Sequence, residues 1–268
     1  MPDIVIFGRY LPGNSLIHRM DPRAKLLLSL FLVVVIFSAL SFWGLAVCAV
    51  SVIGLFSLAR IPLRKALRSI GPLFFIVIIT ALFNIFFIQG GTVYIQWGFI
   101  EVSAGGLYQA AFIGCRLTLL LLSMSLLTLA TATLDITDAF EYLFSPFARL
   151  GMPAHELSIM MGIALRFLPQ FAFELQTIHR AQISRGANYS TSPFKGGLRM
   201  LSSLMIPLFT SAFRHAETLS SAMDSRCYHG GVGRTRLHPL YYSGLDRNAL
   251  IVLIVLFVFV IATNFIPR

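Results

Sequence analysis

A run without a single charged side chain, from Leu26 to Ala59, constrains the fold of this chain more than any other feature of its sequence. A membrane-spanning helix needs about 20 apolar residues, so the run is long enough for two tightly connected spans divided near Ser41–Gly44. Only 12% of the side chains are charged, against about 25% in soluble domains. We therefore expect an integral membrane protein.

Three more apolar runs predict further spans, at 72–89, near 107–132 and at 248–266. Residues 60–68 hold four basic side chains and no acidic one, whereas residues 90–104 hold one Glu and no Lys or Arg. Cytoplasmic loops are enriched in Lys and Arg, so we predict five spans with the N-terminus in the cytoplasm and the C-terminus outside. The net charge of +10 lies in short loops of this kind, which argues against nucleic acid as a partner.

The segment between the fourth and fifth spans has a different character. Charged side chains recur along it, and no uncharged run reaches the roughly 18 residues of a span. Apolar and polar residues alternate there in steps of three and four, which is typical of amphipathic helices. The apolar stripes consist of Ile159, Ile163, Phe167, Phe171 and Leu175 on the first helix and Leu201, Met205 and Leu208 on the second. Pro169 and Pro207 should each kink their helix.

These patterns predict an all-α integral membrane protein in three parts. Residues 1–133 form an N-terminal transmembrane domain with four spans, and residues 247–268 form a C-terminal transmembrane helix. Residues 134–246 form a cytoplasmic domain of long, bent helices. Their apolar sides face the membrane domain or a partner in the membrane.

A short basic element occurs twice, as AQISRG at 181–186 and as AMDSRC at 222–227. Each copy ends one amphipathic helix, so Arg185 and Arg226 are expected at two exposed helix ends. A guanidinium group presents a rigid fork of donors that suits carboxylates on another protein. Alternatively, each arginine interacts with the last carbonyl groups and the dipole of its own helix. The duplication favours a role in binding.

With these motifs the chain resembles, over nearly its whole length, the transmembrane T component of energy-coupling factor (ECF) vitamin transporters. HRMDPRAKL at 18–26 is similar to the family element His-Arg-Leu-Asp-Pro-Arg-x-Lys-Leu, with Met20 in place of Leu. Residues 165–186 resemble the first coupling helix with its X-Arg-Gly element. SAMDSRCY at 221–228 resembles the second, and Cys227 stands where glycine is common.

The resemblance implies a coupling role without chemistry in this chain. A T component binds two cytoplasmic ATPase subunits, here through Ser184, Arg185, Gly186, Ser225, Arg226 and Cys227. Its apolar helix faces, described above, hold a membrane-embedded S component that carries the vitamin. ATP and Mg²⁺ are bound by the ATPases, so no cofactor is expected here. The expected location is the plasma membrane of a prokaryote.

Several single residues have structural interpretations. Asp21, Pro22 and Arg23 suit a helix cap with proline at the first position, and Asp21 is expected to anchor the first span. Arg116 lies inside the fourth span, where it is either functional or extends toward the membrane interface.

Asn84 is expected to hydrogen bond to a neighbouring helix. Asp135 and Asp138 suit a helix start better than a metal or acid–base site.

Two other function classes stay open. A self-contained secondary transporter or channel usually shows inverted repeats and broken spans, whereas the repeat here lies in the amphipathic helices. A lipid-modifying membrane enzyme would need clustered acids or histidines, for which only Asp135 and Asp138 qualify. The sequence contains no H-x-x-x-H, C-x-x-C or G-x-x-x-x-G-K-[ST] pattern, so we expect neither a metal site nor ATPase activity.

Overall fold

The computed structural model describes residues 10–88, 90, 92–97, 100–144, 154–186, 195–230 and 241–265. The chain divides into two compact units. The first unit, named the bundle below, comprises Gly8–Ala139 and Pro239–Arg268, so the last helix packs with the N-terminal ones. The second unit, the crossed-helix unit, is formed mainly by Phe140–His238.

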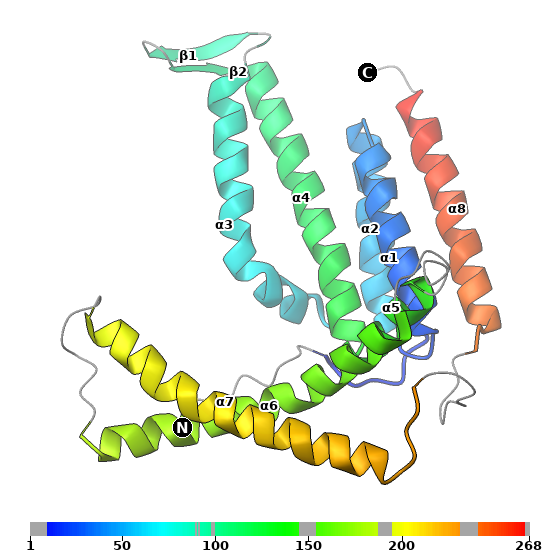
Figure 1. The fold of residues 1–268 in the computed structure, drawn as a ribbon. Coiled ribbons are helices and arrows are strands. Elements are labelled where there is room, and N and C mark those ends of the chain that lie inside the picture. Colours follow the sequence, from blue (N-terminus) through cyan, green and yellow to red (C-terminus); the bar gives the residue numbers. More distant parts are fainter. Residues whose placement is uncertain are drawn as a thin grey trace. The chain divides into compact units, whose positions relative to one another are not determined.

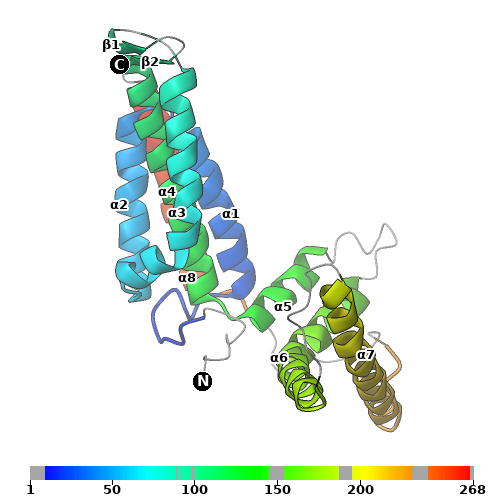
Figure 2. The same ribbon diagram turned by 90° about the vertical axis from the view of Figure 1, so that its left-hand side faces the viewer.

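Long helices make up the bundle. They are α1 (Pro22–Ser38), α2 (Phe42–Ala59), α3 (Leu63–Phe87), α4 (Ala104–Ala130) and α8 (Gly244–Asn264), and α5 (Thr133–Phe144) begins in this unit. α4 packs against α1, α2 and α3, and α8 packs against α1 and α2, as Figures 1 and 2 show. Val35, Ile36, Val52 and Phe56 are buried at the centre. Because lipid is as apolar as these side chains, close packing rather than exclusion of water holds the helices together.

The prediction of an all-α membrane protein is confirmed. In the part of the chain that the structure describes, five helices are long and apolar enough to cross a membrane: α2, α3, α4, α8 and residues Glu156–Ser184. The last of these belongs to α6 (Ala154–Ser184) of the crossed-helix unit, which we did not predict as a span because charges interrupt it. α1, with 17 residues, is at the lower limit of about 17–25 residues for a span and packs within the bundle. The chain is a multi-pass membrane protein.

The uncharged run forms α1 and α2, and its corner is held by side chains of two other helices. Asn264 of α8 donates to the Ser38 carbonyl oxygen at 2.8 Å and accepts from the Leu40 N–H at 2.9 Å. Arg116 of α4 donates to the carbonyl oxygen of Ala39. Backbone groups left unpaired within a bilayer cost several kcal/mol each. The structure therefore gives Arg116, for which the sequence left two interpretations open, a role in closing this corner.

α3 begins earlier than predicted. We expected a span from residue 72, but Leu63–Phe87 is one helix with Pro72 inside it. Figure 1 shows α3 bending near its N-terminal end, as expected where a proline removes a backbone hydrogen bond. Basic residues predicted in a loop at 60–68 therefore lie partly on the first turns of this helix. The prediction for Asn84 was wrong, because its amide donates to the Thr80 carbonyl oxygen of the same helix at 2.7 Å.

Residues 90–104, predicted as a loop, contain a short antiparallel hairpin. Its strands are β1 (Val93–Trp97) and β2 (Ile100–Ser103), with Trp97 paired to Ile100. β-Branched and aromatic residues, which are frequent in this segment, favour extended backbone. The hairpin is the one departure from helical structure among the elements that the structure describes.

The connection from the hairpin to α4 requires a close approach of two backbones. The hydroxyl of Ser103 accepts from the Gly106 N–H at 3.1 Å and donates to the Ile88 carbonyl oxygen at 3.2 Å. A Cβ atom on Gly106 would lie 2.7 Å from that same carbonyl oxygen of Ile88. α3 and α4 can therefore meet here only because residue 106 has no side chain.

We predict that Gly106→Ala destabilises the bundle by about 1–3 kcal/mol, the usual cost of overpacking. The control is Gly114→Ala in the same helix, where an added Cβ meets nothing within 4 Å, so that variant should be at least as stable as wild type. Thermal unfolding of the purified chain in detergent measures both. Equal midpoints for the two variants would contradict the close approach.

The crossed-helix unit contains two long helices, α6 (Ala154–Ser184) and α7 (Lys195–Asp224). They pack against each other and cross in Figure 1. Pro169 lies inside α6 and Pro207 inside α7, as predicted, and both helices continue past their proline.

Candidate functional site

Both copies of the repeated basic element end their helix in the same backbone conformation. In the first copy Gly186 has a left-handed φ of 83°, and its N–H donates to the Ile183 carbonyl oxygen at 2.9 Å. In the second copy Cys227 has a φ of 55°, and its N–H donates to the Asp224 carbonyl oxygen, also at 2.9 Å. A left-handed residue at this position closes the last helical turn and redirects the chain. The two copies are therefore matched in structure as well as in sequence.

The second helix end carries a conformational cost that the first does not. Glycine adopts left-handed backbone freely, whereas a residue with a Cβ atom pays about 1–2 kcal/mol. Cys227 adopts this conformation nevertheless, and the Tyr228 N–H adds a further bond to the Met223 carbonyl oxygen at 3.1 Å. The hydrogen bonds at the end of α7 therefore impose the turn without help from glycine.

We predict that Cys227→Gly stabilises the chain by about 1 kcal/mol, because it removes the cost of a left-handed Cβ residue. The reciprocal control is Gly186→Ala, which introduces the cost of a left-handed Cβ residue at the end of α6 and should destabilise the chain by a similar amount. Chemical denaturation in detergent measures both changes. Stabilisation by both substitutions, or by neither, would show that the two helix ends are not equivalent.

Arg185 and Arg226 each occupy the position directly before the left-handed residue. Both side chains are exposed, and neither guanidinium group bonds to another residue in the part of the chain that the structure describes. The neighbouring serines serve their own helices, because Ser184 and Ser225 donate to backbone carbonyl oxygens at 3.1 Å. Figure 1 shows the C-terminal ends of α6 and α7 at opposite ends of the crossing. The structure thus places the six predicted docking residues in two separate groups.

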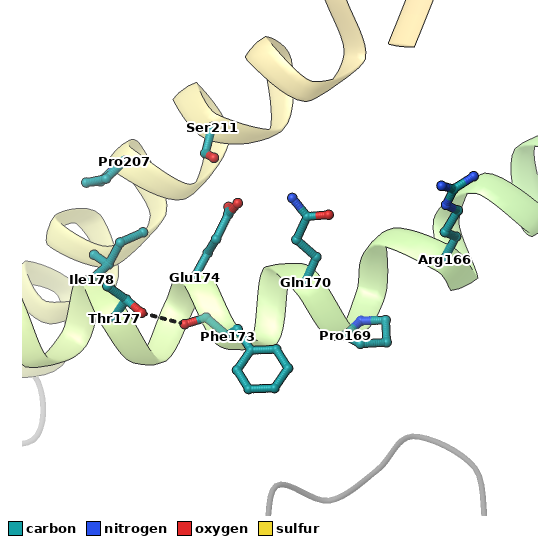
Figure 3. A pocket seen from close by; sticks show the side chains of 9 residues that line it. All are labelled: Arg166, Pro169, Gln170, Phe173, Glu174, Thr177, Ile178, Pro207 and Ser211. Atoms are coloured by element: carbon teal, nitrogen blue, oxygen red, sulfur yellow. Dashed lines mark hydrogen bonds between the residues drawn. The ribbon is translucent and has the colours of Figure 1, made fainter. Parts of the chain in front are cut away.

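Polar side chains meet where α6 and α7 cross. The ring Nε2–H of His215 on α7 donates to Oε1 of Glu174 on α6 at 2.6 Å. The Gln170 amide nitrogen lies 3.0 Å from the same ring nitrogen, and the Ser211 hydroxyl oxygen lies 3.4 Å from it. Figure 3 shows Gln170, Glu174 and Ser211 pointing into the space between the two helices. We name His215, Glu174 and Gln170 the clasp.

A second polar contact joins the same helices. Pro207 has no N–H, so it cannot donate to the carbonyl group of Ser203, four residues before it. The Gln182 amide of α6 donates to this oxygen at 3.4 Å. Gln182 lies in the last turn of α6. This contact therefore joins the helix end that carries Arg185 to the proline turn of α7.

The predicted apolar stripes are only partly at the surface. Leu201 is 57% exposed, but the other seven are half-buried: Ile159, Ile163, Phe167, Phe171, Leu175, Met205 and Leu208. The rings of Phe167 and Phe171 pack against His215, with ring centres 5.8 and 6.0 Å from its own.

Other large apolar side chains are more exposed, namely Met160, Leu168 and Phe173 on α6 and Ile206, Phe209 and Phe213 on α7. The apolar stripe of an amphipathic helix is at least about 100° wide, so part of it can pack inside the unit while the rest stays outside.

The DPR motif lies at the start of α1 and reaches the start of α8. Asp21 caps α1 by accepting from the Arg23 N–H at 2.9 Å, and Pro22 is the first helical residue. The Asp21 N–H donates in turn to Asp246, 225 positions later, at 3.1 Å. Asp246 also caps α8 by accepting from the Ser243 N–H at 2.7 Å. Sequence reasoning missed Asp246, although S-x-x-D before an apolar run is a capping signal.

Asp135 lies in the first turn of α5, the helix-start position that the sequence favoured. Among the described residues, no three His, Cys, Asp or Glu side chains are grouped closely enough to hold a metal ion.

Comparison with known proteins connects these features to a family. The family model CbiQ, described as cobalt transport protein, matches residues 13–238, which include the DPR motif and both basic elements.

The chain belongs to the CbiQ family.

Curated relatives of this CbiQ family chain carry the name "Energy-coupling factor transporter transmembrane protein EcfT". The protein from Bacillus subtilis (strain 168) is 40% identical over 256 residues, covering 96% of this chain and 97% of the relative. The protein from Thermosediminibacter oceani is 42% identical over 247 residues, covering 92% and 93%. The protein from Brevibacillus brevis is 41% identical over 252 residues, covering 94% and 95%. The resemblance predicted from the motifs is confirmed.

Proposed function

We propose that this chain is the energy-coupling transmembrane subunit of an ECF-type importer for vitamins or similar micronutrients. It transmits the movement of two cytoplasmic ATPases to a membrane-embedded S component that binds the substrate. The names of the relatives, which cover almost the full chain, support a role in energy coupling.

The observation that carries the proposal is the pair of matched helix ends. Arg185 and Arg226 are exposed and each precedes a left-handed residue, at helix ends that lie at opposite ends of one crossing. A single partner would need only one such helix end, whereas two ATPase subunits provide two equivalent binding sites. A fork of guanidinium donors fits a carboxylate on each subunit. Each arginine directly precedes the left-handed residue that closes its helix.

The S component is proposed to bind the outer apolar side chains of α6 and α7. Phe209 and Phe213 are 60% and 73% exposed and, four residues apart, share one helix face, and contiguous exposed apolar side chains mark an interface. Leu201 contributes to this surface. The half-buried residues of the predicted stripes lie beneath this surface. Among them, Phe167 and Phe171 pack against His215 of α7.

In this proposal the chain itself carries out no reaction. ATP and Mg²⁺ are bound by the ATPases, and the substrate is bound by the S component. The complex resides in the plasma membrane of a prokaryote, with the N-terminus of this chain in the cytoplasm, because the basic residues of 60–68 mark the cytoplasmic side. Motion then reaches the S component through α6 and α7.

The test is a detergent pull-down of the ATPase pair from the same organism. We expect wild type to retain both ATPases and the Arg185→Glu/Arg226→Glu variant to lose them, with affinity reduced at least a hundredfold, since breaking one desolvated ion pair costs about 3–5 kcal/mol. The matched control is Arg166→Glu/Arg214→Glu, which makes the same charge change at exposed arginines on the same two helices.

The control variant should retain both ATPases. If wild type captures no ATPase, the coupling function fails and a self-contained transporter becomes the leading interpretation. If both double variants capture the ATPases equally well, the coupling function stands and the assignment of Arg185 and Arg226 fails.

A further inference from the structure

We propose that the clasp, together with Gln182, sets the angle at which α6 and α7 cross and thereby positions Arg185 and Arg226 for their partners. His215, Glu174 and Gln182 are then positioning residues for coupling. This inference rests on the proposed function for its consequence, but the geometry of the crossing is tested separately below.

The clasp joins one side chain of α7 to two of α6, and two phenylalanine rings of α6 pack against the same histidine. Phe167, Gln170, Phe171 and Glu174 recur at steps of three and four, so they share one face of α6. The two phenylalanine rings pack on the His215 ring. Glu174 accepts a hydrogen bond from the ring atom Nε2, and the amide nitrogen of Gln170 lies close to the same atom. Apolar contacts alone allow two helices to slide past each other. A ring that packs against two other rings and also bonds through one nitrogen favours one register over others.

The pair of His215 and Glu174 differs from an ordinary surface ion pair. The two side chains are 30% and 25% exposed, and the second carboxylate oxygen of Glu174, Oε2, is buried with no hydrogen-bond partner among the described residues. Fully exposed pairs contribute little because water competes for both partners. Here the carboxylate has already lost part of its hydration, so the contact from His215 is harder to replace by water.

The second contact explains why the crossing matters for the helix ends. Gln182 lies three residues before Arg185, and it donates to the carbonyl oxygen of Ser203, four residues before Pro207. The proline turn of α7 therefore offers an acceptor that the last turn of α6 uses. With the clasp and Gln182 both in place, α6 touches α7 through polar groups at two separate points. Two points fix an angle, which one point cannot do.

The crossing can be measured in the full-length chain without any partner. Spin labels are placed at the exposed positions Ala181 and Ser220 through Ala181→Cys and Ser220→Cys. The native cysteines are removed by Cys48→Ala, Cys115→Ala and Cys227→Gly. Pulsed electron paramagnetic resonance of the chain in lipid nanodiscs then reports the distribution of distances between the two helices near their ends.

We expect Glu174→Gln and His215→Phe to broaden this distribution, because the first removes the charge at nearly constant shape and the second keeps a ring but removes the hydrogen bond. Gln182→Met, which removes the second contact at similar volume, should broaden it as well. His215→Arg restores a donor to the carboxylate and should keep the distribution narrow. Glu156→Gln, at an exposed position of the same helix, is the matched control and should resemble wild type.

The effect of the helix crossing on transport is measured in the complex with its ATPases and S component, reconstituted in liposomes. Glu174→Gln and His215→Phe should lower substrate uptake per ATP hydrolysed by about tenfold. This is the change expected from the net contribution of one hydrogen bond to a charged group. His215→Arg should remain close to wild type. A loss of folding alone would not be rescued by the charged replacement.

Unchanged distance distributions in all variants overturn the proposal. Broadened distributions with unchanged uptake per ATP also overturn it, because the crossing would then not serve coupling. A wild-type chain that binds no ATPase refutes the proposed function instead, and the distance measurement still decides whether the clasp sets the crossing.

Discussion

The absence of water from the bilayer is the constraint on which the structure of this chain depends. Every backbone N–H and C=O group inside it must find a partner within the protein. Helices satisfy this requirement along their length, and their ends must satisfy it by other means. The corner between α1 and α2 shows how this is done, because Asn264 and Arg116 supply groups to Ser38, Ala39 and Leu40 from two other helices. The start of α1 is closed similarly by Asp246.

The need to pair backbone N–H and C=O groups also explains contacts within the crossed-helix unit. Each proline removes one helical donor, and the carbonyl oxygen of Ser203, four residues before Pro207, accepts from Gln182. Each helix then ends in a left-handed residue whose N–H closes the last turn. The result is a pair of like ends that present arginine at opposite ends of the crossing. In the proposed function, partner binding uses residues next to those that close the helix ends.

Much of the fold was predictable because its signals are local. An uncharged run reports a span through composition alone, and steps of three and four residues report an amphipathic helix through periodicity. The repeated A-x-x-S-R pattern located both helix ends, since the left-handed residue follows directly in each copy. The hairpin and the early start of α3 were missed. A short strand and a proline that a helix accommodates both depend on neighbouring elements, which local patterns do not contain.

The residues that connect distant segments were the least predictable part of the site. Glu174 and His215 are 41 positions apart, and Asp21 and Asp246 are 225 positions apart. The residues around each of these side chains form no pattern that identifies its distant partner. The sequence by itself determined that the chain is a membrane protein with two amphipathic helices ending in exposed arginines, because hydropathy, helical periodicity and helix-end signals act over a few residues. Only the tertiary structure decided which part of each apolar stripe faces inward and which side chains join the helices, because those choices are made by packing between elements far apart in the chain.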